Sequence, residues 1–177
     1  ETDEFAQEIG TFGARNVALT LAGSREVRTH VRVGVSLHGV LSTIADYRAS
    51  ALAADVGVLY ALPASAFAVS ASVHNVGLTL SSLGDTRDAL PLDVRLSASK
   101  RLQYLPLLVT VTGYNLHDPG AGPSGRTAAE QIVGHLALGG ELQFSPAFNA
   151  RVGFSPRRNQ ELRTADRLDT AGLSLGF

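Results

Sequence analysis

Hydrophobic and polar residues alternate along most of this chain. In residues 54–77, ADVGVLYALPASAFAVSASVHNVG, one run puts Val56 and Tyr60 on the same side of an extended backbone. After a Pro-Ala-Ser corner, a second run puts Phe67 and Val69 on one side in the same way. A two-residue period is typical of a β-strand whose two faces meet different surroundings. The pattern therefore predicts a hairpin with one apolar face.

The same alternation recurs along the whole chain and predicts about nine strands. We expect them at residues 17–21, 31–41, 55–60, 67–73, 92–99, 105–114, 135–144, 148–154 and 171–177. Alternation of this regularity is typical of antiparallel sheets. The predicted fold class is therefore all-β, with antiparallel strands that run up and down in the order of the sequence.

The connections between these strands differ in length. Short corners are expected at residues 62–66 and 145–147, and longer polar stretches at 81–91, 115–131 and 155–170. Bacterial outer-membrane barrels have short turns at one end and long loops at the other, although soluble sandwiches can share this feature. Thr127 and Glu130 have the spacing of a capping box, but the strand pattern resumes soon afterwards, so we expect at most one helical turn there.

The residues opposite the apolar rows distinguish a soluble sandwich from a membrane barrel. A soluble sandwich usually carries long charged side chains on its outer face. Here that face is predicted to be mostly small, with a few charged or imidazole side chains. Its members are Gly34, Ser36, Gly57, Ala68, Ser70, Ser72, Ser97, Thr110, Thr112, Gly153, Ser174 and Gly176, with Arg32, His38, Asp55, His74, Arg95 and Arg151. This composition favours a crowded, wet barrel lumen, with the apolar rows facing lipid.

Composition narrows the classes further. The 177 residues include 18% charged residues with a net charge of −1, which gives no field that would attract nucleic acid. Cysteine is absent, so disulfides and thiolate sites are excluded. No apolar run is long enough for a membrane helix, whereas barrel strands of about 9–11 residues cross a membrane by alternation. Aromatic residues reach only 6% and Trp is absent, which leaves few residues for the aromatic girdles of such barrels.

We therefore expect residues 1–177 to form a single transmembrane β-barrel domain. Barrels made of one bacterial chain almost always have an even number of strands. Because about nine are visible, we expect the barrel to be incomplete and to lack N-terminal strands of the full-length protein.

Few residues suggest chemistry. Ser174 lies in a Gly-x-Ser-x-Gly sequence, but within an alternating strand and not at a strand-to-helix turn, so a nucleophile is not expected. The five histidines lack the close spacing of common zinc motifs. We predict no catalytic, cofactor-binding or metal-binding residue.

Asp55 and Arg151 are the more informative charges, because each lies next to a glycine on the small-residue face. A charge there must be paired, which predicts a network of lumenal salt bridges; a ligand or gating contact is the alternative. Asn75 and Gly77 are expected to shape the beginning of a loop, since both residue types tolerate positive φ. The charged stretch 156–163 is expected to be a solvated loop, with partner docking as the alternative.

Several segments resemble one family of membrane proteins. DVGVLY (55–60) followed by HNVG (74–77) resembles the Asp-x-Gly-x-x-Tyr and Asn-x-Gly pattern of FadL-like outer-membrane barrels, which include the PorV and PorQ proteins of the type IX secretion system. LPLDVRLSASKRLQYLPLLVTVTGYNL (90–116), GHLALGGELQFSPAFNARVGFSPRRNQEL (134–162) and AGLSLGF (171–177) are similar to PorQ-like segments in the same order. The resemblance covers roughly residues 5–177, and it rests on the order and spacing of short motifs.

The resemblance implies a location in the bacterial outer membrane and a non-enzymatic role in type IX protein secretion. The chain would be a scaffold for export and surface attachment of cargo, in contact with outer-membrane lipid and other secretion components. The motif residues with implied structural roles are Asp55, Gly57, Asn75, Gly77, Glu141, Arg151 and Gly153, and the implied docking loop contains Arg157, Arg158 and Glu161. Two alternatives remain open: a FadL-like transporter of hydrophobic small molecules and a soluble β-sandwich binding module.

Overall fold

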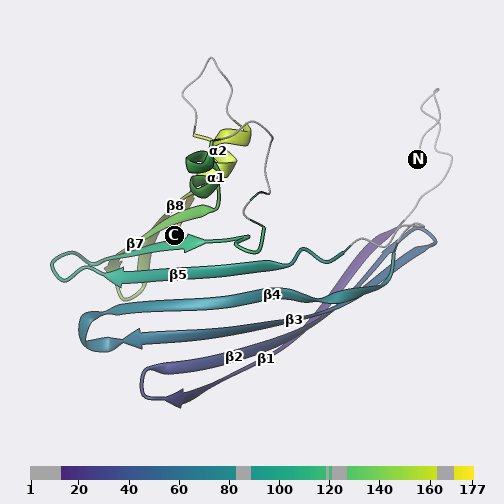
Figure 1. The fold of residues 1–177 in the computed structure, drawn as a ribbon, viewed down its shortest axis with the longest axis horizontal. Helices are drawn as coiled ribbons and strands as arrows, with labels where there is room; N and C mark the ends of the chain where they lie inside the picture. The colour runs from purple at the N-terminus through teal and green to yellow at the C-terminus, as the bar shows by residue number, and fades with distance from the viewer. Residues whose placement is uncertain (1–12, 83–88, 119, 121–126, 163–169) are drawn as a thin grey trace.

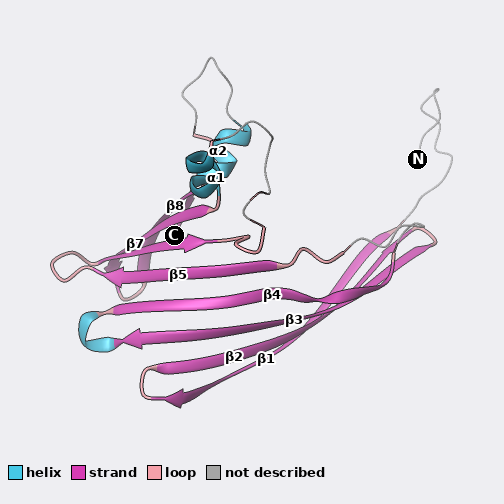
Figure 2. Ribbon diagram, viewed as in Figure 1, coloured by secondary structure: helices cyan, strands magenta, loops and turns pink. Residues whose placement is uncertain are grey.

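Nine strands form a single antiparallel sheet in the order of the sequence (Figures 1 and 2). The computed structural model describes residues 13–82, 89–118, 120, 127–162 and 170–177. The strands are β1 (Ala14–Arg28), β2 (Val31–Ile44), β3 (Tyr47–Leu62), β4 (Phe67–Ser81), β5 (Asp93–Arg101), β6 (Leu107–Gly113), β7 (Leu136–Ser145), β8 (Phe148–Phe154) and β9 (Leu173–Gly176). The predicted all-β, antiparallel, up-and-down fold is thus confirmed.

The sheet is not closed into a barrel. Every strand pairs with its neighbour in sequence, and β1 and β9 form the two edges without pairing to each other. The ladder of hydrogen bonds from β1 to β9 does not return to its starting strand, so the described residues form an open sheet. The transmembrane barrel of which we expected them to be an incomplete part stays a prediction.

The short connections gather at one end of the sheet, which we call the short-turn end. It consists of the turns at 29–30, 63–66, 102–106 and 146–147. The opposite end, called the long-connection end, holds the described residues of the connections 82–92, 114–135 and 155–172, together with a two-residue turn at Ala45 and Asp46. The predicted segregation of short and long connections is confirmed, with the β2–β3 turn as the exception. Residues 83–88, 119, 121–126 and 163–169 of the predicted long loops lie outside the described residues.

Two short helices lie in the long connections, and both depart from the sequence-based expectations (Figure 2). Helix α1 (Ala128–Gly134) starts at the predicted capping box, but its seven residues exceed the single turn that was expected. Helix α2 (Pro156–Leu162) occupies the segment expected to be a loop. Its start has Ser155 before Pro156, and the Asn159 N–H donates to the Ser155 carbonyl (3.1 Å). Proline suits the first position of a helix because it has no N–H to satisfy there.

The two faces of the sheet differ in composition along all nine strands. The outer face, as we call it, is apolar; most of it consists of Val17, Leu19, Leu21, Val33, Val35, Leu37, Leu52, Val56, Val58, Phe67, Val69, Val73, Val94, Leu96, Val109, Val111, Leu138, Leu142, Val152, Leu173 and Leu175. Register keeps these residues on one side because each directly opposite pair shares a face. The other side, the inner face, carries the small and polar residues predicted above.

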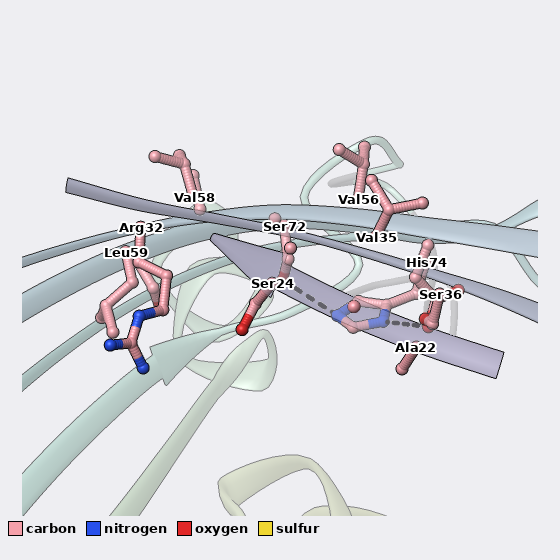
Figure 3. A pocket seen from close by; sticks show the side chains of 16 residues that line it. Ala22, Ser24, Arg32, Val35, Ser36, Val56, Val58, Leu59, Ser72 and His74 are labelled. Atoms are coloured by element: carbon pink, nitrogen blue, oxygen red, sulfur yellow. Dashed lines mark hydrogen bonds and ion pairs between the residues drawn. The ribbon is translucent and has the colours of Figure 1, made fainter. Parts of the chain in front are cut away.

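The inner face lies on the concave side of the curved sheet. Figure 3 shows Ser24, Arg32 and His74 pointing toward the side on which the later strands lie, whereas Val35, Val56 and Val58 point away from it. No hydrophobic side chain is buried among the described residues, and outer-face residues such as Leu19 (68% exposed) and Leu21 (66%) are open. The described part of the chain therefore has no hydrophobic core of its own.

Paired residues also reveal a regular stagger between strands. One row across the sheet runs through Arg28, Val31, Tyr60, Val69, Ala98, Val111, Leu138 and Phe154. It starts beside the turn at 29–30 but ends seven residues beyond Ala147, at the other end of β8. A shift of about one residue per strand, with about 3.3 Å per residue and 4.8 Å between strands, corresponds to a tilt of about 35°. Strands of membrane barrels are tilted by about 35–45°.

Candidate functional site: the polar inner face

Asp55 is the centre of a polar cluster on the inner face of β2, β3 and β4. Its Oδ2 accepts hydrogen bonds from Nε2 of His38 (3.0 Å) and from Nδ1 of His74 (3.1 Å), and its Oδ1 accepts one from the backbone N–H of Asn75 (2.9 Å). The carboxylate thus receives three donors from two neighbouring strands. Such a set of partners offsets the cost of placing a charge among small side chains.

Both histidines of this cluster are satisfied on their second ring nitrogen. Nδ1 of His38 lies 2.9 Å from Oγ1 of Thr20, and Nε2 of His74 lies 2.9 Å from Oγ of Ser72. In a neutral imidazole, one nitrogen donates and the other accepts. If each ring donates to Asp55, its remaining nitrogen accepts from the hydroxyl, so that neutral histidines satisfy every contact. The cluster therefore joins β1 to β4 through side chains.

A second carboxylate follows on β5. Asp93 is only 8% exposed, and its Oδ2 accepts from Nε of Arg95 (2.6 Å). Its Oδ1 accepts from the backbone N–H of Asn115 (2.7 Å), and the residue lies directly opposite His74 in the β4–β5 register. The polar cluster thus extends across five strands.

The two carboxylates use the same local device, which we call the Asp–Asn clasp. In each case the Asp is followed by Val within a strand. One carboxylate oxygen of the Asp accepts a hydrogen bond from the backbone N–H of an asparagine 20 or 22 residues later. Asn75 and Asn115 both have left-handed backbones, with φ of 59° and 53°. Asparagine is one of the few residues that adopts this conformation at low cost. The clasp fixes an irregular backbone position that a plain ladder would leave unpaired.

Asn75 and Gly77 do not begin a loop, which corrects the expectation from sequence. Both lie within β4, at the irregularity in pairing between Ala54 and Val56 of β3. The predicted positive φ is confirmed for Asn75 and is absent at Gly77. Gly77 is required for a different reason: a Cβ there would collide with the backbone of Leu52 and lie 2.6 Å from Cα of Ala53.

The other predicted charges lie at the far side of the sheet. Arg151 on β8 donates from Nε to Oε2 of Glu141 on β7 (2.7 Å), directly across the ladder. Arg151 is 61% exposed, so water screens much of this pair. Gly153 lies one inner-face position further along β8, where a Cβ would meet Oγ of Ser174 at 2.5 Å. The structure therefore does not bring Asp55 and Arg151 together; each has its own partners.

A hollow of about 570 Å³ lies over the inner face beside the Asp55 cluster (Figure 3). Ser24, Arg32, Ser36, Ser72 and His74 contribute its polar groups. Gly57 forms part of its floor, and a Cβ there would approach Cβ of Ser72 to 3.3 Å. Apolar atoms nevertheless make up most of the lining, and Ala22, Leu59 and Ala71 are among the residues that supply them.

Ser72, His74 and Asp55 are connected in the order of a serine hydrolase triad, but the surroundings do not suit catalysis. Ser72 lies mid-strand between Gly57 and Arg95 in the ladder. Backbone N–H groups of a flat ladder point along the sheet toward neighbouring strands. None is therefore directed above Ser72, where an oxyanion would need donors. Ser174 likewise lies within β9. Among the described residues, no group of three or more His, Asp or Glu side chains is arranged to hold a metal ion.

The predicted docking residues lie on helix α2 and not in a loop. Arg157 donates from Nε to Oε1 of Glu161 one turn later (2.8 Å), and this hydrogen bond raises the pKa of the Arg157 guanidinium. Arg158 is exposed. Helix α2 contacts α1, and the two form a small helical layer at the long-connection end (Figure 1).

Sequence reasoning missed the partners of Asp55 and the whole Asp93 group. His38, His74 and Arg95 were placed on the correct face, and hydrogen bonds to Asp or Ser were expected for the histidines, but none was assigned to a particular carboxylate; Asp93 was not singled out. A signal was present: an Asp-Val pair occurs at Asp55 and at Asp93, with an asparagine 20 and 22 residues later. Neither charge spacing nor alternation reveals that the asparagine backbone is the partner.

None of the helices that the structure describes has the length and apolar character needed to span a membrane. Comparison of the chain with models of protein families, with curated proteins and with solved structures gave no match.

Proposed function

We propose that this chain is a lipid-facing wall of a bacterial outer-membrane β-barrel. The observation that carries the proposal is the outer face: apolar, exposed and continuous over nine strands, with no core beneath it among the described residues. Water does not stabilise such a surface, and large exposed apolar patches mark contact with a membrane or another protein. The small and polar concave face then lines the lumen.

The dimensions of the outer face support a bilayer as its solvent. Arg15 and Arg25 lie on this face of β1, ten residues apart, with Val17, Leu19 and Leu21 between them and no charge. Ten residues at about 3.3 Å, tilted by about 35°, span roughly 27 Å along the membrane normal. The apolar band of outer-membrane barrels is about 25 Å tall.

Aromatic side chains support the same placement. Tyr60, Phe67, Phe144 and Phe148 lie within five residues of short turns, and Tyr104 lies in one of these turns. The rings of Phe144 and Phe148 contact each other, with centroids 5.6 Å apart. Aromatic residues at the edge of an apolar band are typical of the membrane interface.

We further propose that this wall serves as a non-enzymatic scaffold in type IX protein secretion. The resemblance of its ordered motifs to PorQ-like segments supports this role, and the long connections with α1 and α2 provide the surface for secretion partners. A transporter of hydrophobic molecules is the second candidate, and the mostly apolar lining of the hollow on the inner face supports it. A soluble sandwich would need a second sheet over the outer face, whereas the described strands form one sheet.

Single cysteines test the membrane placement without background, because the chain has none of its own. Leu96→Cys and Ala98→Cys on the outer face of β5 should react with lipid-soluble reagents. Bimane attached there should be quenched by nitroxide-labelled lipids. Ser97→Cys and Ser99→Cys on the inner face are the matched controls and should react with water-soluble maleimides instead. Equal labelling of all four positions by water-soluble maleimide would overturn the membrane placement.

A photo-crosslinker tests the secretion role. Placed at Arg158 in α2, it should capture another component of the secretion system in the intact outer membrane. Placed at Tyr104 in the opposite end of the sheet, it should not capture that component. Capture at neither position, together with retention of a hydrophobic small molecule by the purified barrel, would favour the transporter.

A further inference from the structure

Basic residues are distributed unevenly between the two ends of the sheet. Within five residues of the short turns lie six basic and two acidic residues: Arg25, Arg28, Arg32, Lys100, Arg101 and Arg151, against Glu26 and Glu141. The described residues at the long-connection end include equal numbers of basic and acidic residues: Arg15, Arg48, Arg95, Arg157 and Arg158, against Asp46, Asp93, Asp118, Glu130 and Glu161. The short-turn end is therefore the positively charged end of the described chain.

Both acidic residues at this end lie on the inner face, each across from an arginine. Glu141 pairs with Arg151, and Glu26 lies directly opposite Arg32. Arg25 and Lys100 lie instead on the outer face, in register with Val33 and with Phe67 and Val109. Neither forms an ion pair in the described part of the chain. These two cations, together with Arg28 opposite Val31, thus remain on the apolar side without an ion-pair partner in the described part of the chain.

Their depth suits the headgroup region of a bilayer. Arg25 lies four residues before the turn at 29–30, and Lys100 two residues before the turn at 102–106, where the apolar rows of β1 and β5 end. Long basic side chains at such an edge extend their charge toward the interface while the stem stays on apolar surface. The groups at this depth in a phospholipid leaflet are phosphodiesters, which bind arginine and lysine by charge-assisted hydrogen bonds.

We propose that Arg25 on β1 and Lys100 on β5, four strands apart, make the short-turn edge of the outer face a binding site for several anionic phospholipid headgroups. This inference rests on the proposed membrane placement and deepens it, because it assigns the short-turn end to a leaflet of phospholipids. Arg28 at the tip of the same hairpin adds positive charge to the site.

The test is lipid selection from mixed bilayers. The protein is inserted into vesicles of equal phosphatidylcholine and phosphatidylglycerol, extracted in mild detergent, and its retained lipids are counted by native mass spectrometry. One basic residue near an anionic surface changes affinity by about fivefold. Phosphatidylglycerol should therefore be enriched about fivefold or more over phosphatidylcholine, and the enrichment should fade in 0.5 M salt, where charges are screened within about 4 Å.

Two double variants remove the same charge at opposite edges of the outer face. R25Q/K100Q should abolish the enrichment, whereas R15Q/R48Q, whose residues lie in one row with Thr43 at the long-connection end, should keep it. Equal loss in both variants would show a general effect of net charge and would overturn the site. Loss of the enrichment with 10 mM inorganic phosphate at constant ionic strength would show a site for free phosphate and would also overturn it.

Pure phosphatidylcholine vesicles separate the two proposals. Insertion into them without lipid selection in the mixed vesicles would overturn the headgroup site and leave the membrane placement standing. Failure to insert into either kind of vesicle would overturn both.

Discussion

Asp55 shows how a single residue organises the inner face. Its two oxygen atoms hold two imidazoles and one backbone N–H from neighbouring strands, with distances of 2.9–3.1 Å. Asp93 repeats part of this arrangement with Arg95 and Asn115. These contacts join strands through side chains on a face that has few large apolar groups to pack. At the residue scale, hydrogen bonds to carboxylates therefore link neighbouring strands in addition to the backbone ladder.

Removal of this carboxylate should be costly. Asp55→Ala leaves two imidazoles and the Asn75 N–H without their acceptor, and hydrogen bonds to charged groups are each worth about 1.5–3 kcal/mol. We expect the free energy of unfolding in vesicles, measured by urea titration, to fall by about 2–4 kcal/mol. Glu141→Ala removes an exposed pair and should cost less than about 1 kcal/mol. Equal losses in the two variants would contradict the role given to the Asp55 cluster.

At the scale of elements, each strand presents one apolar face and one face of small or polar residues. On β1 the outer face runs from Arg15 through Val17, Leu19 and Leu21 to Arg25. The residues between the two arginines carry no charge on this side. The pairing of β1 with β2 has no β-bulge over this length. Strand β1 alone therefore defines an apolar band on the outer face, with Leu19 near its centre and Arg15 and Arg25 at its two edges.

A charge placed along this band should reveal its depth. Leu19→Arg lies near the centre and should destabilise the protein in a bilayer by about 2–4 kcal/mol, whereas Val17→Arg, close to the edge, should cost about 0–1 kcal/mol. The measurement is the same urea titration in vesicles, since the cost arises from moving a guanidinium into hydrocarbon. If both variants unfold at the same urea concentration as the parent, lipid does not contact this face.

At the scale of the whole molecule, the curvature of the sheet and the stagger of its strands determine its shape. The row of pairs that begins at Arg28 and ends at Phe154 crosses the sheet obliquely, and this tilt is the one that closed barrels need. The open edges β1 and β9 carry unpaired backbone groups, which hydrocarbon does not tolerate. In a membrane, further strands must therefore pair with both edges.

A closed assembly of this kind has a simple signature. The full-length protein should fractionate with the outer membrane, and its folded form should migrate differently from the boiled form on a denaturing gel, because a closed ladder resists detergent until heated. The boiled sample of the same fraction is the control. A protein that is recovered in the aqueous fraction and shows no shift would contradict the assembly.

Much of the fold could be predicted, and much of the site could not. Alternation located all nine strands and both faces, since the pleat gives side chains a period of two. The corner at Pro63 and the capping box at Thr127 were also visible. Helix α2 was missed although Ser155 and Pro156 form a typical helix start, because its charged residues were read as a solvated loop. The partners of Asp55 were not predictable, since they depend on register across 17–20 residues of chain.

The sequence by itself determined which residues share a face, because the side-chain direction of a strand is set by local backbone geometry. It also determined where short turns occur, through proline and small residues. Only the tertiary structure decided that the apolar face is convex and lacks a core, that Asp55 and Arg151 belong to separate groups, and that β1 and β9 remain apart. These features depend on the pairing register and on the twist summed over nine strands, which no single segment encodes.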